Sequence, residues 1–145
     1  MMTTTAAFSI RPANWARDEV AIAKVRQEVF IDEQRVPDEL EWEAIDAACR
    51  WFVAESYAGI IGIARLLPDG HFGRMAVRLA WRRRGIGSGL LNAAMQAALE
   101  SGLNRVVLSA QVHAIPFYAR AGFQVQGPEY LDAGIPHRTM IRELK

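Results

Sequence analysis

The most constraining feature of this chain is a run of arginines and glycines placed between a strand and a helix. Residues 82 to 89 read Arg-Arg-Arg-Gly-Ile-Gly-Ser-Gly, after a β-like run at 71–77 and before an apolar helix-like run at 90–99. Glycine lets the backbone come close to a ligand and adopt positive φ. A helix start offers unpaired N–H groups, and arginine adds forked, permanently charged donors. The junction therefore predicts a cradle for an anion, as in a phosphorylated small molecule.

This glycine segment differs from two common phosphate-binding motifs. It has no GxxxxGK[ST] pattern, so it is not a P-loop. A GxGxxG fingerprint would need glycine at Leu90, and the acidic residue expected after the next strand is missing. The motif that remains is Arg82-x-x-Gly85-x-Gly87. A surface turn, with glycines for packing alone, is the structural alternative.

The hydrophobic pattern predicts a mixed sheet with helices on its faces, in the order β-α-β-β-β-α-β-α-β-β. We expect strands at 8–11, 50–55, 60–67, 71–77, 105–110, 123–125 and 135–144. We expect one helix from the cap Asn14 to about Phe30, with others at 85–101 and 115–121. The middle helix carries only a narrow polar line, at 88, 92, 96 and 100, so most of its surface should be buried.

Charge is segregated along the chain although the net charge is only +1. Residues 32–46 hold seven acids and one base, and residues 74–84 hold five arginines and no acid. Such a pair of segments suits a protein that handles an anionic cofactor and a cationic or polar substrate. For the acidic segment alone, the preferred interpretation is a solvated face.

Length and composition favour one globular domain, residues 1–145, with 51% apolar and 23% charged residues. The single cysteine, Cys49, begins the apolar run 49–54, which predicts a buried structural thiol in a reducing cytoplasm. Residues 1–7 lack the features of a signal peptide, and the apolar run 59–64 is too short to span a bilayer. We expect a cytoplasmic protein with no membrane partner and, without a CxxC or His/Cys cluster, no metal.

A second motif, Ala114-Ile115-Pro116-Phe117-Tyr118-Ala119-Arg120-Ala121-Gly122-Phe123, follows the next strand. With Arg82-x-x-Gly85-x-Gly87 it resembles the signatures of the GNAT superfamily of acyl-CoA-dependent N-acetyltransferases, although Gln111 stands where asparagine is usual. The segments 29–34, Glu41-Trp42 and 134–137 are similar to the ElaA/YjcF-type branch. The resemblance implies an α/β (α+β) fold with a mixed, mostly antiparallel central sheet of about seven strands flanked by helices.

The resemblance also implies acetyl-CoA as cosubstrate, with no metal. By the resemblance, the cofactor-binding residues are Met75, Ala76, Val77, Arg82, Arg83, Arg84, Gly85, Ile86, Gly87, Ser88, Gly89, Gln111, Phe117 and Tyr118. The strand residues 75–77 would offer backbone groups to the pantetheine arm, one of them an N–H for the carbonyl oxygen, and 82–89 would hold the pyrophosphate. Arg83 and Arg84 either reach the 3′-phosphate or are simply exposed.

By the resemblance, Tyr118 is the candidate general acid, because a phenol placed near the sulfur can protonate the leaving thiolate. An aromatic packed on the sheet is its structural alternative. The acceptor amine must lose a proton, since a free amine has a pKa of about 10. The sequence offers Glu33, Glu41, Asp46, His71, His113 and His137 as bases. His137 and Glu33 are the candidates by their match to the branch, and Glu33-Gln34 would line the acceptor pocket.

The sequence thus predicts an acetyl-CoA-dependent N-acetyltransferase that acts on a primary amine, of a small molecule more readily than of a protein. No activated cysteine is visible, so direct transfer in a ternary complex is expected. A non-catalytic acyl-CoA binding or sensing module is the first alternative. A nucleic-acid binder that uses the arginines of 78–84 is the second, but an isoelectric point of about 8.0 and a lone Trp81 disfavour it, so no nucleic-acid partner is expected. The resemblance also allows a homodimer.

Overall fold

A computed structural model describes residues 7–144, so the expectation about a signal peptide concerns residues that lie, except for Ala7, outside the described part. Seven strands form one sheet in the order β1-β2-β3-β4-β5-β7-β6, antiparallel except for the β4–β5 pair. The strands are β1 Ser9–Pro12, β2 Arg50–Ser56, β3 Gly59–Leu66, β4 His71–Val77, β5 Arg105–Gln111, β6 Gln124–Asp132 and β7 Ile135–Glu143. The predicted element order and the mixed seven-stranded sheet are confirmed.

The α-helices are α1 Trp15–Arg26, α2 Asp38–Glu41, α3 Ile86–Glu100 and α4 Ile115–Arg120. A π-helical segment, η1 Gln27–Glu33, continues α1, and three 3₁₀ turns are η2 Ala44–Ala48, η3 Leu79–Trp81 and η4 Val112–Ala114. Asn14 caps α1 as predicted, because its side chain accepts a hydrogen bond from the Arg17 N–H. No helix in the described part of the chain is long and apolar enough to cross a membrane.

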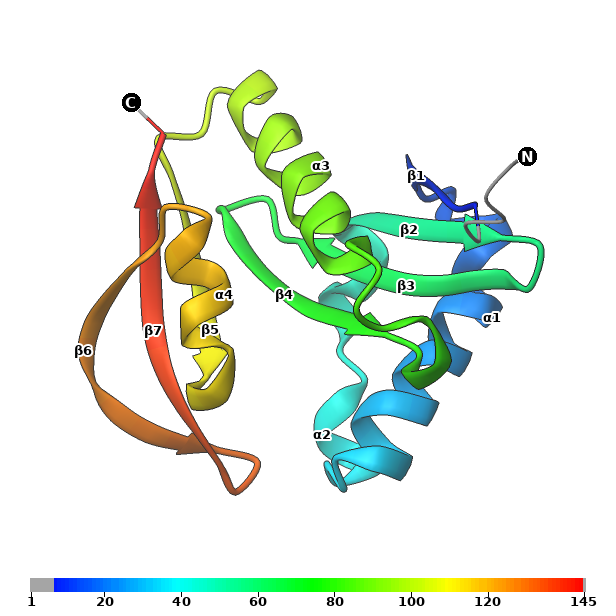
Figure 1. Cartoon of the computed structure of the whole chain (residues 1–145), viewed down its shortest axis with the longest axis horizontal. Coiled ribbons are helices and arrows are strands. Elements are labelled where there is room, and N and C mark those ends of the chain that lie inside the picture. Colours follow the sequence, from blue (N-terminus) through cyan, green and yellow to red (C-terminus); the bar gives the residue numbers. More distant parts are fainter. Residues whose placement is uncertain (1–6, 145) are drawn as a thin grey trace, which may run out of the picture.

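Helices cover both faces of the sheet, and each face has its own hydrophobic core (Figure 1). On one face α3 buries Leu90, Leu91 and Ala94, as its narrow polar line predicts, and α4 packs beside it. On the other face α1 buries Ile22 and Val25. The sheet is therefore packed against helices on both faces.

The sheet opens between β4 and β5 (Figure 1). These parallel strands pair only at His71↔Val107 and Phe72↔Leu108, near the start of β4. Farther along, β4 carries a bulge: the register passes from Arg65↔Gly73 to Ile63↔Ala76, and Arg74 has a φ of 47°. A bulge bends and twists its strand, so β4 turns away from β5 and a gap opens in the middle of the sheet.

Four expectations need correction. The α-helical part of the first helix ends at Arg26 rather than Phe30, because η1 continues it. The strand expected at 123–125 extends to Asp132, since Pro128 lies where the β6–β7 register is irregular on an edge strand and its missing N–H costs nothing. Cys49 precedes β2 and is half-buried, with its thiol donating to the Ile45 carbonyl at 3.2 Å. The acidic segment is not simply a solvated face, because two of its carboxylates are buried, as described below.

Candidate functional site

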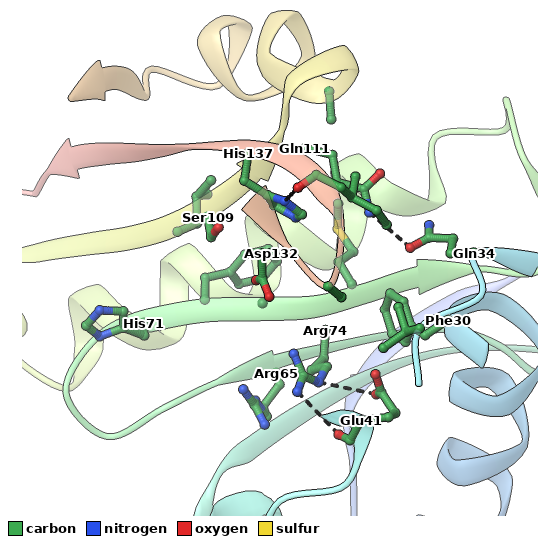
Figure 2. Close-up of a pocket in the computed structure, with 18 of the residues that line it drawn as sticks. Phe30, Gln34, Glu41, Arg65, His71, Arg74, Ser109, Gln111, Asp132 and His137 are labelled. Carbon is green, nitrogen blue, oxygen red and sulfur yellow. Dashed lines mark hydrogen bonds and ion pairs between the residues drawn. The ribbon is translucent and has the colours of Figure 1, made fainter. Parts of the chain in front are cut away.

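A cavity of about 470 Å³ occupies the gap between β4 and β5 (Figure 2). Its walls come from five parts of the chain far apart in sequence: the segment around η1 and α2, β3, β4, β5 with α4, and the β6–β7 hairpin. Met75 and Tyr118 belong to the core on the α3 face, whereas Arg74 contacts Glu41 beside α2. Since all four residues line the cavity, it passes through the sheet from one face to the other.

The predicted anion cradle lies at the start of α3. Gly85 is the N-cap residue with a φ of 81°, and no side chain caps the helix. The first N–H groups of α3 have no carbonyl partner inside the helix and carry its positive dipole end. A Cβ on Gly87 would lie 3.8 Å from the Met75 Cε and 3.7 Å from the Phe117 Cζ. Because Met75 also lines the cavity, the cradle and the cavity adjoin.

The three arginines of the cradle have different environments. Arg82 donates to both oxygens of the Glu33 carboxylate, at 2.8 and 2.6 Å, and to the Val77 carbonyl at 2.8 Å. Arg84 lies over the Trp81 ring at 4.8 Å. Arg83 is exposed and has a φ of 64°. Arg82 thus fixes the loop to η1, and Arg83 and Arg84 are the arginines with accessible guanidinium groups.

Glu33 lies outside the cavity wall, although its neighbour Gln34 belongs to it. The hydrogen bonds from Arg82 lower the pKa of Glu33, which makes this carboxylate a weaker proton acceptor. Gln34 accepts a hydrogen bond from the Gln111 Nε2 at 3.0 Å (Figure 2). This bond bridges the gap, so the segment that follows α1 and the end of β5 are held together across the cavity.

Tyr118 lies on α4 and lines the cavity, with the rings of Phe117 and Phe123 packed edge-on at 5.0 and 6.0 Å. Burial raises the pKa of its phenol to about 12, because the phenolate would lose its hydration. At neutral pH the side chain therefore holds its proton firmly and is a donor rather than a base.

His137 begins the inner part of β7, is buried, and lines the same cavity. Its Nδ1 lies 2.7 Å from the Ile135 carbonyl oxygen (Figure 2). A carbonyl only accepts, so this bond places a proton on Nδ1 and leaves Nε2 as the acceptor of the neutral ring. Tyr130 stacks on the imidazole, and its hydroxyl is hydrogen-bonded to the Ser109 hydroxyl. The ring is thereby held in one orientation and one tautomer.

The acidic segment is anchored by a buried arginine. Arg26 is 1% exposed and donates to Glu41 at 2.7 Å and to Asp46 at 2.9 Å. Its guanidinium also lies 4.6 Å from the Trp42 ring centre and 5.2 Å from that of Trp51. Both carboxylates are buried with it, so part of the acidic segment is a structural ion-pair network.

Two more arginines extend this network to the cavity wall. Arg65 donates from Nη1 to Glu43 at 2.6 Å and to Asp46 at 2.7 Å. Arg74 donates from Nη2 to Glu43 at 3.1 Å, and its Nε lies 3.2 Å from the Glu41 carboxylate. Both arginines line the cavity. Sequence reasoning missed them, although a single charged residue inside the apolar run 60–67 was a signal for a buried ion pair.

The structure brings Met75, Gln111, Tyr118 and His137 together at the cavity and leaves Glu33 paired with Arg82 outside it. His113 and His71 also line the cavity, and both are exposed. Asp132 is a further wall residue that the sequence did not single out; it is exposed and ends β6. No cluster of three or more metal-ligating side chains is found in residues 7–144.

Comparisons with known proteins agree with this architecture. A family model described as an acetyltransferase (GNAT) domain matches residues 15–144. The chain is 35% identical over 123 residues to YjcF of Bacillus subtilis (strain 168), an uncharacterized N-acetyltransferase, covering 82% of this chain and 88% of YjcF.

Two solved structures are similar as well. An acyl-CoA N-acyltransferase from Pseudomonas aeruginosa has a TM-score of 0.79 and 30% identity, covering 94% of this chain and 99% of that one. Escherichia coli ElaA has a TM-score of 0.81 and 24% identity, covering 94% and 100%. The fold and these matches define an acyltransferase that uses an acyl-CoA donor. The chain belongs to the GNAT acetyltransferase family and to its ElaA/YjcF-type branch, as the sequence motifs predict.

Proposed function

We propose that this acyltransferase moves the acetyl group of acetyl-CoA to the primary amine of a small molecule, by direct transfer in a ternary complex. The observation that carries the proposal is the opening in the sheet, which joins the cradle of α3 to a cavity containing Tyr118 and His137. Donor and acceptor can then approach the same point from opposite faces. A cavity of about 470 Å³ suits a small acceptor better than a protein surface.

The donor would be held mainly by backbone groups. Residues 85–89 would receive the pyrophosphate at the start of α3, where glycine leaves the N–H groups accessible. Arg83 and Arg84 would add charge, and Arg82 would position the loop through Glu33. Met75, Ala76 and Val77 on the free side of β4 would offer N–H and carbonyl groups to the pantetheine arm and to the carbonyl oxygen that gains charge.

An ammonium acceptor must lose two protons, one before attack and one as the amide forms, and the leaving thiolate must gain one. The Nε2 of His137 would take a proton from the acceptor ammonium or from a bridging water, because its Nδ1 is committed to Ile135. The neutral amine then attacks the thioester carbon, and the C–S bond breaks as the amide forms. Tyr118 would give its phenolic proton to the leaving thiolate, and the second proton lost by the attacking nitrogen would return to the phenolate through water. Burial raises the pKa of the Cys49 thiol, which disfavours an acyl-enzyme on that residue.

Thermal unfolding with acetyl-CoA tests the donor site. At about a hundredfold over its dissociation constant, acetyl-CoA should stabilise the protein by roughly 2.7 kcal/mol, a rise in Tm of about 5–10 °C. Gly87→Trp should abolish the rise by filling the space between Met75 and Phe117. Gly87→Ala is the matched control, since its Cβ meets ordinary contact distances. An absent rise, or one that survives Gly87→Trp, refutes the donor site.

Release of coenzyme A, followed with a thiol reagent and a panel of primary amines, tests transfer itself. Amine-dependent release supports the proposed function. Stabilisation by acetyl-CoA without release by any amine would instead indicate a binding module.

A further inference from the structure

We propose that the acceptor is a zwitterion, an amine that carries its own carboxylate. The carboxylate would lie against Arg65 and Arg74, and the amine would lie toward Asp132 and His137. This inference rests on the proposed function, because it assigns the substrate class of the same cavity. It narrows the sequence-based expectation of a cationic or polar acceptor.

The first observation is a pair of guanidinium groups, buried in Arg65 and half-buried in Arg74, whose hydrogen bonds to described residues use only some of their donors. Arg65 is 7% exposed, and its hydrogen bonds all run from Nη1. Those of Arg74 all run from Nη2. The Nε of Arg65 is buried and makes no hydrogen bond with a described residue, whereas the Nε of Arg74 lies 3.2 Å from the Glu41 carboxylate. A buried N–H without a partner is unusual and calls for an acceptor. A carboxylate fits, because guanidinium forks bind it with paired hydrogen bonds.

The second observation is the charge of the network behind this wall. Its three carboxylates, Glu41, Glu43 and Asp46, face three guanidinium groups, those of Arg26, Arg65 and Arg74. The acidic segment therefore presents no surplus negative charge to the cavity. It holds the two wall arginines in place and leaves their free donors for a ligand.

The third observation is that the cavity wall across the gap from the two arginines carries a carboxylate and an imidazole. Asp132 ends β6, His137 lies on β7, and both line the cavity from the β5 side, whereas the two arginines come from β3 and β4 (Figure 2). Asp132 is held by a two-residue turn, in which Ala133 and Gly134 have φ values of 52° and 79°. A two-residue hairpin turn requires this left-handed backbone, so the turn fixes the position of Asp132 at the end of β6.

The cavity is also lined by the apolar side chains of Phe30, Val36, Leu40 and Leu67. An acceptor with a charged group at each end and an apolar side chain matches these charged and apolar lining residues. The geometry thus points to amino carboxylic acids with an apolar side chain.

The test compares amino acids with the amines formed by removing their carboxylate. Leucine and isopentylamine form one pair, and phenylalanine and phenethylamine form another. For each compound we would measure binding by calorimetry in the presence of coenzyme A, and kcat/KM from coenzyme A release with acetyl-CoA. The native protein should prefer the amino acid of each pair by at least about tenfold, since a hydrogen bond to a charged group contributes about 1.5–3 kcal/mol.

Two variants distinguish a ligand contact from a structural effect. Arg74→Gln should weaken binding of the amino acid about 10- to 100-fold and leave the decarboxylated amine nearly unchanged, and Arg74→Lys should restore part of the preference. Arg105→Gln, which breaks an exposed pair with Glu143 at the far end of β5, is the matched control and should change neither ligand. The acetyl-CoA-dependent rise in Tm must persist in each variant, which shows that the fold and donor site are intact.

The outcomes separate this inference from the proposed function. Equal use of both members of a pair, an equal loss for both in Arg74→Gln, or a preference for a phosphorylated amine overturns the zwitterion. If amines react without regard to a carboxylate, transfer is upheld and the inference fails. If amino acids bind through Arg74 and no coenzyme A is released, the inference is supported and transfer fails.

Discussion

Removing the guanidinium of Arg26 should destabilise the protein strongly and in a pH-dependent way. Arg26→Met keeps much of the apolar stem and deletes the guanidinium, which lies against the rings of Trp42 and Trp51 and pairs with two buried carboxylates. Breaking a buried ion pair by removing one partner costs about 3–5 kcal/mol. Here each carboxylate keeps a second guanidinium, Asp46 that of Arg65 at 2.7 Å and Glu41 that of Arg74 at 3.2 Å.

We therefore expect the lower end of that range, about 3 kcal/mol at pH 7. For a chain of this size the loss corresponds to a fall in Tm of about 6–12 °C. The pKa values of Glu41 and Asp46 should rise in the variant, because each carboxylate loses a counter-charge. A carboxylate whose folded pKa lies above its unfolded value destabilises the fold at neutral pH, and the penalty shrinks as the pH falls toward that unfolded value.

Urea unfolding of the native and variant proteins at pH 7 and pH 5 measures both effects. Lys24→Met, an exposed change on the same helix, is the control and should stay within about 0.5 kcal/mol of the native protein. A loss below about 1 kcal/mol for Arg26→Met, or a loss that is the same at both pH values, would refute the assignment of Arg26 as the anchor of the acidic segment.

Two further predictions concern catalysis and acid stability. Tyr118→Phe should lower kcat by about 10²–10⁴ while the acetyl-CoA-dependent rise in Tm is retained, and steady-state coenzyme A release with an unchanged kcat would exclude Tyr118 as the acid. Arg11 donates to Asp18 at 2.8 and 3.1 Å and lowers its pKa to about 2, so the pair contributes about 1–2 kcal/mol of stability above pH 4 that is lost as the pH falls toward 2. Urea unfolding between pH 2 and 5 should show this dependence and Asp18→Asn should reduce it; equal slopes would argue against the pair.

The order of elements and the glycine cradle were predictable because both are local in the sequence. The predicted strand 71–77 coincides with β4, and the predicted strand 105–110 lies within β5. Each is a short apolar run between turn residues, and such runs reveal strands without knowledge of their partners. The two signatures around Gly87 and Tyr118 likewise depend on short spacings.

The acceptor side of the cavity was much less predictable, because its residues meet only through the fold. Arg65 and Arg74 pair with carboxylates 19 to 33 residues away, so neither their burial nor their charge balance could be inferred from spacing. The bulge at Arg74 could not be predicted from the residue type, since arginine rarely adopts a positive φ. Because of these long-range ion pairs, part of the acidic segment is a buried network rather than a solvated face.

The partial pairing of β4 with β5 has a consequence for where the unpaired backbone of the sheet lies. Within residues 7–144, β4 beyond Phe72 has no strand partner on the side of β5. Edge strands at the perimeter of a sheet have unpaired N–H and carbonyl groups, which can pair with other chains and promote aggregation. The unpaired segment of β4 instead borders the cavity in the interior of the sheet, between β4 and β5. A small ligand in the cavity can therefore reach unpaired backbone of β4 that is separate from the perimeter strands β1 and β6.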